Sequence, residues 1–182
     1  MNNRNLTIFA LVAANVLATL FATENPTVGG APMYANKNII QNAMNSKDHT
    51  TLVTAVKAAG LVDTLQGKGP FTVFAPTNEA FEKLPMGTVD TLLKPENKQK
   101  LAGILTYHVV TGKWSADQLV EKIKADGGST SIKTVNGEEL TAKLGNGGVL
   151  LTDAKGGTAM VSIADVMQSN GVIHVIDTVL MP

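Results

Sequence analysis

One short stretch of the chain carries a strand, a stop and a helix start in succession: Phe71-Thr72-Val73-Phe74-Ala75-Pro76-Thr77-Asn78-Glu79-Ala80-Phe81. Residues 71–75 are rich in aromatic and β-branched side chains, which favours a strand. Pro76 cannot donate a backbone hydrogen bond to a sheet and therefore interrupts the strand. Thr77 is a good helix N-cap, and Asn78 at the same corner can hydrogen-bond to nearby backbone. We therefore predict a strand that turns directly into a helix.

Helical patterns lie on both sides of this stretch. Apolar residues recur at helical spacing in three upstream segments, residues 38–44, 48–59 and 61–65. Downstream, Pro95 suits the first turn of a helix. Ser115 and Gln118 form a capping box, which predicts a further helix start. Between these two helices we predict a strand over residues 107–110, because β-branched side chains disfavour a helix there.

The remainder of the chain reads as a succession of strands. The predicted strands are residues 131–135, 138–144, 149–152, 158–164 and 172–180. Asn136-Gly137 between the first two is a strong hairpin signal. The last strand is apolar on both faces, which is typical of a central strand buried on two sides. Helices, a strand, more helices and then a run of strands predict an α+β fold with a mainly antiparallel sheet and several packed helices.

The composition excludes several classes of protein. The chain has 182 residues, of which 44% are hydrophobic, and this is too apolar for a disordered chain and enough for one folded domain. Fifteen basic and fifteen acidic side chains balance, so the charge that dominates nucleic-acid affinity is missing. The absence of Cys excludes a disulfide scaffold, a thiolate zinc site and a thiol nucleophile.

The first residues resemble an export signal. Residues 6–22 carry no charge and follow Arg4, and their length suits a signal-peptide core better than a membrane span. We predict a signal peptide over residues 1–22, with a retained anchor as the alternative. Residues 23–36 contain Pro and Gly without periodicity and are predicted to be a flexible leader, so the domain proper spans 37–182. The protein is then expected to be secreted, either extracellular or periplasmic, with no stable membrane insertion after cleavage.

No pattern in the sequence indicates catalysis. The three His residues lack metal-ligand spacing, and no Gly-x-Ser-x-Gly nucleophile motif or phosphate-binding loop is present. We therefore predict no catalytic residues, no metal site and no cofactor. A secreted hydrolase remains a third hypothesis, because distant Ser, His and Asp residues can in principle assemble.

Two His residues and the single Trp have two interpretations each. His108 and His174 lie in apolar segments, where a buried imidazole must be hydrogen-bonded. Each is either a neutral side chain that hydrogen-bonds two segments together, or a ligand or pH-sensing group. Trp114 precedes the capping box and is either an exposed anchor for a sugar or protein, or a staple packed against the following helix.

Three segments together resemble the fasciclin-domain (βig-h3/fasciclin) family. They are the stretch of residues 71–81 already quoted, Tyr107-His108, and the closing segment Asn170-Gly171-Val172-Ile173-His174-Val175-Ile176-Asp177. The resemblance covers about residues 37–182 in the family's order. A stand-alone domain whose mature chain has no Asn-x-Ser/Thr acceptor is most similar to bacterial secreted single-domain members. The resemblance implies a wedge of β-strands with helices packed around it.

The resemblance also implies a function and a set of residues. It implies a secreted, non-catalytic adhesion or cell-surface interaction module whose partner is a cell-surface or matrix protein or a polysaccharide. The alternative is a polysaccharide-binding or small-ligand-binding module of the periplasm or cell wall. The candidate interaction residues, which can equally be structural, are Pro76, Thr77, Asn78, Tyr107, His108 and Trp114. The residues assigned to structural motifs are Phe74, Phe81, Asn170, Gly171 and His174.

Overall fold

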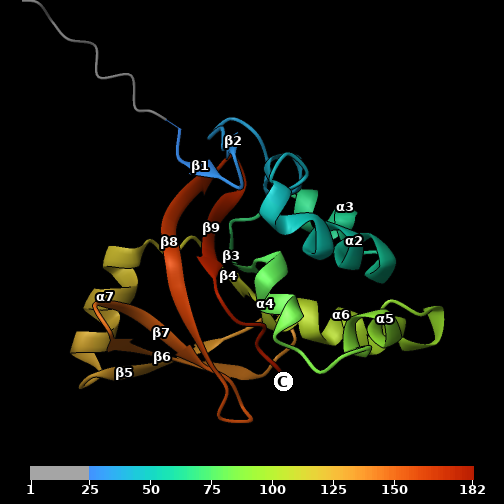
Figure 1. Cartoon of the computed structure of the whole chain (residues 1–182). Coiled ribbons are helices and arrows are strands. Elements are labelled where there is room, and N and C mark those ends of the chain that lie inside the picture. The colour runs from blue at the N-terminus through green and yellow to red at the C-terminus, as the bar shows by residue number, and fades with distance from the viewer. Residues whose placement is uncertain (1–24) are drawn as a thin grey trace, which may run out of the picture.

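The strands occupy the centre of the molecule. A computed structural model describes residues 25–182, so the predicted signal peptide lies outside the described residues. The strands of the main sheet are β3 (Phe71–Pro76), β4 (Val109–Thr111), β5 (Ser129–Lys133), β6 (Glu139–Gly145), β7 (Gly148–Thr152), β8 (Thr158–Gln168) and β9 (Gly171–Ile176). Within residues 25–182 these seven strands follow the order β4-β3-β9-β8-β7-β6-β5 (Figure 1).

The pairing of the strands is antiparallel with one exception. β3 and β9 run parallel over six residue pairs, from Phe71 opposite Gly171 to Pro76 opposite Ile176. The sheet nearly closes on itself, because Val110 in β4 bridges to Thr134 just after β5. All six residues of β9 are buried, as expected for a central strand. The predicted α+β class with a mainly antiparallel sheet is confirmed.

Helices pack on the sheet from two sides. The helices are α1 (Ile39–Ala43), α2 (Thr50–Ala59), α3 (Val62–Gln66), α4 (Asn78–Glu82), α5 (Thr88–Leu92), α6 (Lys98–Tyr107) and α7 (Ala116–Ala125), with 3-10 turns η1 (Lys47–His49) and η2 (Pro95–Asn97). Thr77 caps α4, and Ser115 with Gln118 forms the predicted capping box at α7. In Figure 1, α2 to α6 lie on one side of the sheet and α7 on the other. No helix within residues 25–182 is long and apolar enough to cross a membrane.

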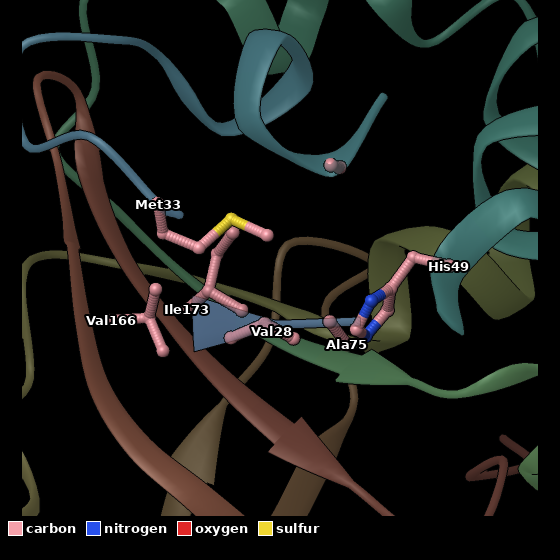
Figure 2. Close-up of a pocket in the computed structure, with 7 residues that line it drawn as sticks. Val28, Met33, His49, Ala75, Val166 and Ile173 are labelled. Atoms are coloured by element: carbon pink, nitrogen blue, oxygen red, sulfur yellow. The ribbon is translucent and has the colours of Figure 1, made fainter. Parts of the chain in front are cut away.

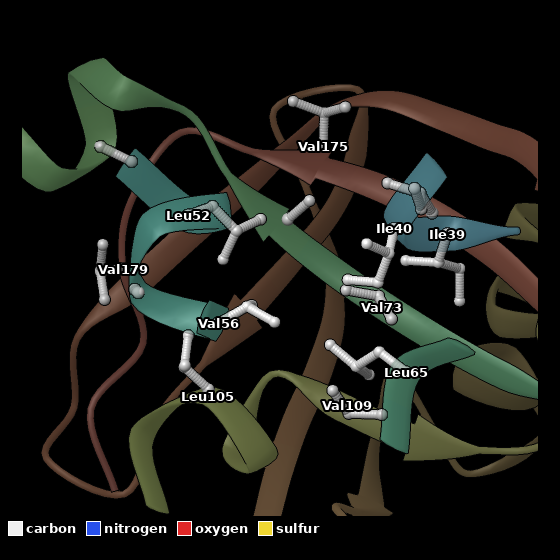
Figure 3. Close-up of a cluster of buried hydrophobic side chains, with 14 of the residues drawn as sticks. Ile39, Ile40, Leu52, Val56, Leu65, Val73, Leu105, Val109, Val175 and Val179 are labelled. Atoms are coloured by element: carbon white, nitrogen blue, oxygen red, sulfur yellow. The ribbon is translucent and has the colours of Figure 1, made fainter. Parts of the chain in front are cut away.

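The central strands separate two hydrophobic cores. On β3, Val73 and Ala75 point into a core shared with the helices, whereas Phe74 points into a second core inside the curved sheet. The first core brings Leu52 and Val56 of α2 against the sheet, as Figure 3 shows. Helix α7 packs against the second core. This alternation follows from the period of two along a strand, and it lets one strand support both cores.

Residues 25–36 differ from the flexible leader that the sequence predicts over residues 23–36. Two short strands, β1 (Thr27–Val28) and β2 (Ala31–Pro32), form a hairpin. Val28 and Met33 are only 3% and 2% exposed and belong to the first core. The backbone of Lys47 donates a hydrogen bond to Gly29 O at 3.2 Å. Two isolated apolar residues leave no periodic pattern in the sequence, and their packing and this hydrogen bond both join the segment to parts of the chain outside it.

Tyr107 and His108 also lie elsewhere than predicted. The segment was assigned to a strand over residues 107–110, but Tyr107 is the last residue of α6 and His108 is its C-cap. The amide of His108 donates to Leu105 O at 3.1 Å. The β-branched residues that end the helix are Val109 and Val110, so the strand begins two residues later. The predicted last strand likewise ends at Ile176, short of Leu180.

Gly171 allows β9 to approach β3, and this contact supplies a test of the fold. A Cβ on Gly171 would overlap the carbonyl oxygen of Phe71. Gly171→Ala should therefore lower the free energy of unfolding in urea by about 3 kcal/mol or more. Gly103→Ala, in α6 with open space around it, should leave stability unchanged or raise it by up to about 1 kcal/mol. Equal stability of the two variants would contradict the close approach.

Candidate functional site

The three motif segments meet on the parallel strand pair β3–β9. Phe74 lies opposite His174 in the register, and their rings stack with centroids 5.7 Å apart and planes inclined by 26°. The amide of Phe74 donates to the carbonyl of His108 at 2.9 Å. The first motif, the Tyr-His motif and the closing motif therefore contact one another directly, although they are distant in the sequence.

His108 connects the end of α6 to the last residues of the chain. Its Nε2 accepts a hydrogen bond from the amide of Leu180 at 3.0 Å, so the ring hydrogen is on Nδ1, which donates to Ile104 O at 2.8 Å. The side chain is buried, and burial lowers the pKa of His108 to about 4, although the bond to Ile104 opposes this. The imidazole is therefore neutral at physiological pH and joins two segments.

His174 holds the loop before α7 against the sheet. Its Nε2 donates to Trp114 O at 2.7 Å, and its Nδ1 accepts from the amide of Asp165 at 3.3 Å. Asp165 Oδ1 in turn accepts from the amide of Ala116, the first residue of α7, at 2.7 Å. Burial lowers the pKa of His174 against the raising effects of Trp114 and Asp165. Both ring nitrogens of this histidine are thus occupied by backbone.

Tyr107 and Trp114 are tied into the same region. The Tyr107 hydroxyl donates to Glu139 O at 3.0 Å and accepts from the amide of Ala154 at 3.1 Å. Burial raises the pKa of this phenol. The amide of Trp114 donates to Thr72 Oγ1 at 2.9 Å. The Trp114 side chain is half-buried and packs against the second core. It is therefore partly packed, as the first of its two interpretations requires, and partly exposed, as the second requires.

Asn78 acts on a helix that is distant in the sequence. Its Oδ1 accepts from the amide of Thr51 at 3.0 Å and from Thr50 Oγ1 at 3.2 Å, and its Nδ2 donates to Lys47 O at 2.8 Å. The residue before α2, His49, provides no side-chain cap. Asn78 therefore caps α2 from outside that helix, in contrast to the predicted bonding to nearby backbone.

The remaining motif residues lie at the corner after β3 and at the turn before β9. Pro76 is buried opposite Ile176, the amide of Thr77 donates to Ile176 O at 3.3 Å, and Phe81 belongs to the first core. Asn170 accepts from the amide of Ile39 at 3.1 Å and donates to the carbonyls of Leu65 and Gly67 at 2.7 and 2.9 Å. One amide side chain thus joins α1 and α3 to the turn before β9.

Sequence reasoning missed a third buried histidine. His49 is 3% exposed, and its Nδ1 is 2.9 Å from Ser46 Oγ. Its Nε2 has no hydrogen-bond partner among residues 25–182. It lies beside a cavity of about 10 Å³ lined otherwise by apolar side chains of the β1–β2 segment, α1 and the sheet (Figure 2). Burial lowers the pKa of His49, and the Ala75 backbone and Asp48 oppose this. A single His in a polar run carries no sequence signal for burial.

Asp153 is a second residue that the sequence did not single out. Its carboxylate accepts from the amides of Lys155, Gly157 and Met181 at 3.0, 2.7 and 2.9 Å. The Asp before a Gly-Gly turn is a recognisable turn signal, but the bond to Met181 is not. In the described part of the chain, no three His, Cys, Asp or Glu side chains form a group that could hold a metal ion.

The three buried histidines predict a specific pH dependence of stability. Their pKa values in the folded state lie below the unfolded value of about 6.5, so the unfolded chain binds more protons below that pH. Stability should be constant between about pH 7.5 and 9 and fall as the pH decreases from about 7 towards 4. His108 alone should cost about 2 kcal/mol between pH 6.5 and 5, at about 1.4 kcal/mol per pH unit. Urea unfolding at pH 7, 6 and 5 measures this loss; a flat profile, with the ring protons of His108 titrating near 6.5, would contradict it.

The cap supplied by Asn78 predicts a graded series of stabilities. Asn78→Ala removes the cap and the bond to Lys47 and should lower the free energy of unfolding by about 1–2 kcal/mol. Asn78→Asp keeps the acceptor and adds a favourable charge at the start of α2, but it replaces the donor to Lys47 O by an oxygen, so its stability should lie between those of the wild type and Asn78→Ala. Asn45→Ala, an exposed position after α1, is the control and should change stability by less than about 0.5 kcal/mol. Equal effects at positions 78 and 45 would exclude the cap.

Comparison with known proteins places these motifs in a family. The model of the Fasciclin domain matches residues 47–182. Protein sll1483 of Synechocystis is 48% identical over 179 residues, which cover 97% of this chain and 92% of that protein. The cell surface glycolipoprotein MPB83 of Mycobacterium bovis is 36% identical over 168 residues, covering 89% of this chain and 69% of that protein.

A solved structure agrees with the architecture. The FAS1 domain pair of the insect cell adhesion molecule fasciclin I superposes with a TM-score of 0.71 at 19% identity, covering 80% of this chain and 51% of that one. At this identity the likeness concerns the fold alone. The match of the family model and the identity to the bacterial relatives lead to one conclusion: the chain belongs to the fasciclin-domain family.

Proposed function

We propose that the protein is a secreted, non-catalytic module that mediates adhesion at a cell surface or envelope. The adhesive part of the proposal rests on membership of the fasciclin-domain family, and the observation that carries its non-catalytic part is the burial of every histidine. His108 and His174 have both ring nitrogens bonded within the fold, and the free nitrogen of His49 faces an apolar cavity. An imidazole that serves as a general base must reach a substrate proton, and none of these three is placed to do so.

The motif side chains support a structural role within this function. Asn78 caps α2, Tyr107 joins α6 to the β-hairpins, and His108 holds the chain end. We infer that Pro76, Thr77, Asn78, Tyr107 and His108 preserve the domain and that partner contacts lie elsewhere on the surface. Fasciclin domains occur in adhesion and cell-surface proteins, and export through residues 1–22 would place this chain in the same setting.

Deletion and add-back of the protein test the proposal. Cells of the producing organism that lack the protein should attach several-fold less to their surface or matrix, and purified protein should bind an envelope or host-surface fraction saturably. The Gly103→Ala variant should restore attachment as the wild type does. Unchanged attachment after deletion, together with no binding to cells, matrix protein or envelope polysaccharide, would overturn the proposal. Turnover of a substrate that is lost in His174→Gln at unchanged melting temperature would support a hydrolase instead.

A further inference from the structure

A hollow lies on the helical side of the molecule, away from the motif residues. It is a broad depression that is open to solvent, with a volume of about 370 Å³. It is formed by the loop before α5, by α5 and by α6; we call it the α5–α6 hollow. Its lining residues are Met86, Gly87, Thr88, Thr91, Leu92 and Lys100. In Figure 1 this part of the molecule lies at the opposite side from α7.

The polar groups of the hollow are free to bind a ligand. Within residues 25–182, Lys100 makes no ion pair, and the hydroxyls of Thr88 and Thr91 make no side-chain hydrogen bond. Asp90 and Glu96 are the acidic side chains nearest in sequence, and neither lines the hollow. The hollow therefore presents one unpaired positive charge beside two groups that both donate and accept hydrogen bonds.

The apolar part of the hollow is equally distinct. Two apolar side chains line it: Met86, which is fully exposed, and Leu92, which is buried. Gly87 has a φ of +80° and open space where a side chain would stand, so the backbone is accessible at this edge. A fully exposed, flexible thioether beside a buried leucine offers apolar contact to a ligand that has an apolar face.

These groups together match a carboxylate-bearing sugar. A uronic acid has a carboxylate for the ammonium of Lys100, ring hydroxyls for Thr88 and Thr91, and a C–H face for Met86 and Leu92. A bare anion would leave the apolar wall unused. An acidic peptide would bring backbone groups that need partners, and the hollow is built from helices and a loop that provide no strand edge.

We propose that the α5–α6 hollow binds a uronic acid unit of an acidic polysaccharide. This inference rests on the proposed adhesive function and names the class of its partner. Binding of one unit depends on an exposed charge, so it is weak and decreases with salt. Repeated units along a polymer, met by many copies of the protein on a surface, raise the overall affinity.

Amide NMR titration of the mature chain locates the binding. Oligogalacturonate should shift the signals of Met86, Thr88, Thr91 and Lys100 saturably, and its fully methyl-esterified form should not. Lys100→Gln should weaken binding at least fivefold. Lys98→Gln is the matched control, because Lys98 is exposed on the same helix but does not line the hollow, and it should bind as the wild type does. Thr91→Val should weaken binding of the oligosaccharide.

The alternatives give different outcomes. Equal binding of the methyl ester, equal loss in Lys98→Gln, or shifts confined to other surfaces would overturn the proposal. Shifts of the same residues by sulfate or by a polyglutamate peptide, at the affinity of the oligosaccharide, would overturn it in favour of a general anion or peptide site. If the protein binds oligogalacturonate but deletion leaves attachment unchanged, the hollow stands and the adhesive function fails. If deletion abolishes attachment and Lys100→Gln attaches normally, the adhesive function stands and the hollow fails.

Discussion

The structure depends on the parallel pairing of β3 with β9. These strands come from opposite halves of the domain, and their pairing requires Gly171, which has room for no side chain beside Phe71. Once they are paired, Val73 and Phe74 point into different cores, so both cores form on the same two strands. The buried histidines then hydrogen-bond segments outside the strand pair. His174 binds the loop before α7, and His108 binds the backbone of Leu180. Loss of the β3–β9 pairing would thus disrupt both hydrophobic cores.

Local signals in the sequence predicted the elements that depend on local chemistry. The strand–Pro–helix corner at Pro76, the cap at Thr77 and the capping box at Ser115 all concern groups within a few residues of one another. The hairpin around Gly29 was missed because its order comes from Val28 and Met33 packing on distant strands. The boundary at Tyr107 was misplaced by two residues because the β-branched Val109 and Val110 predict a strand but do not mark the residue at which the preceding helix ends. The continuous apolar run of the last strand indicated its central position, but it did not identify β3 as its parallel partner.

In the candidate site too, the sequence predicts what depends on nearby residues and misses contacts between residues that are distant in the sequence. A buried imidazole between apolar residues implied that His108 and His174 are hydrogen-bonded, but not to which atoms. The cap of α2 by Asn78 joins residues 27 positions apart, and no spacing rule predicts such a contact. The α5–α6 hollow is still less visible, because Thr88, Thr91 and Lys100 are common surface residues. Their significance arises from their convergence on one concave surface.

The difference between residues that hold the fold together and residues that remain unpaired on the surface bears on how members of one family recognise different partners. Motif side chains that form helix caps, buried hydrogen bonds and core packing stabilise the fold of the domain, and a fold alone does not determine function. Recognition must then come from residues that the fold leaves free. In this chain, Lys100 and the two threonine hydroxyls are such residues, since no ion pair and no side-chain hydrogen bond within residues 25–182 holds them. If the hollow binds as proposed, a change there alters binding with little cost in stability, whereas a change at Asn78 or His108 alters stability first, and any effect on binding follows from it.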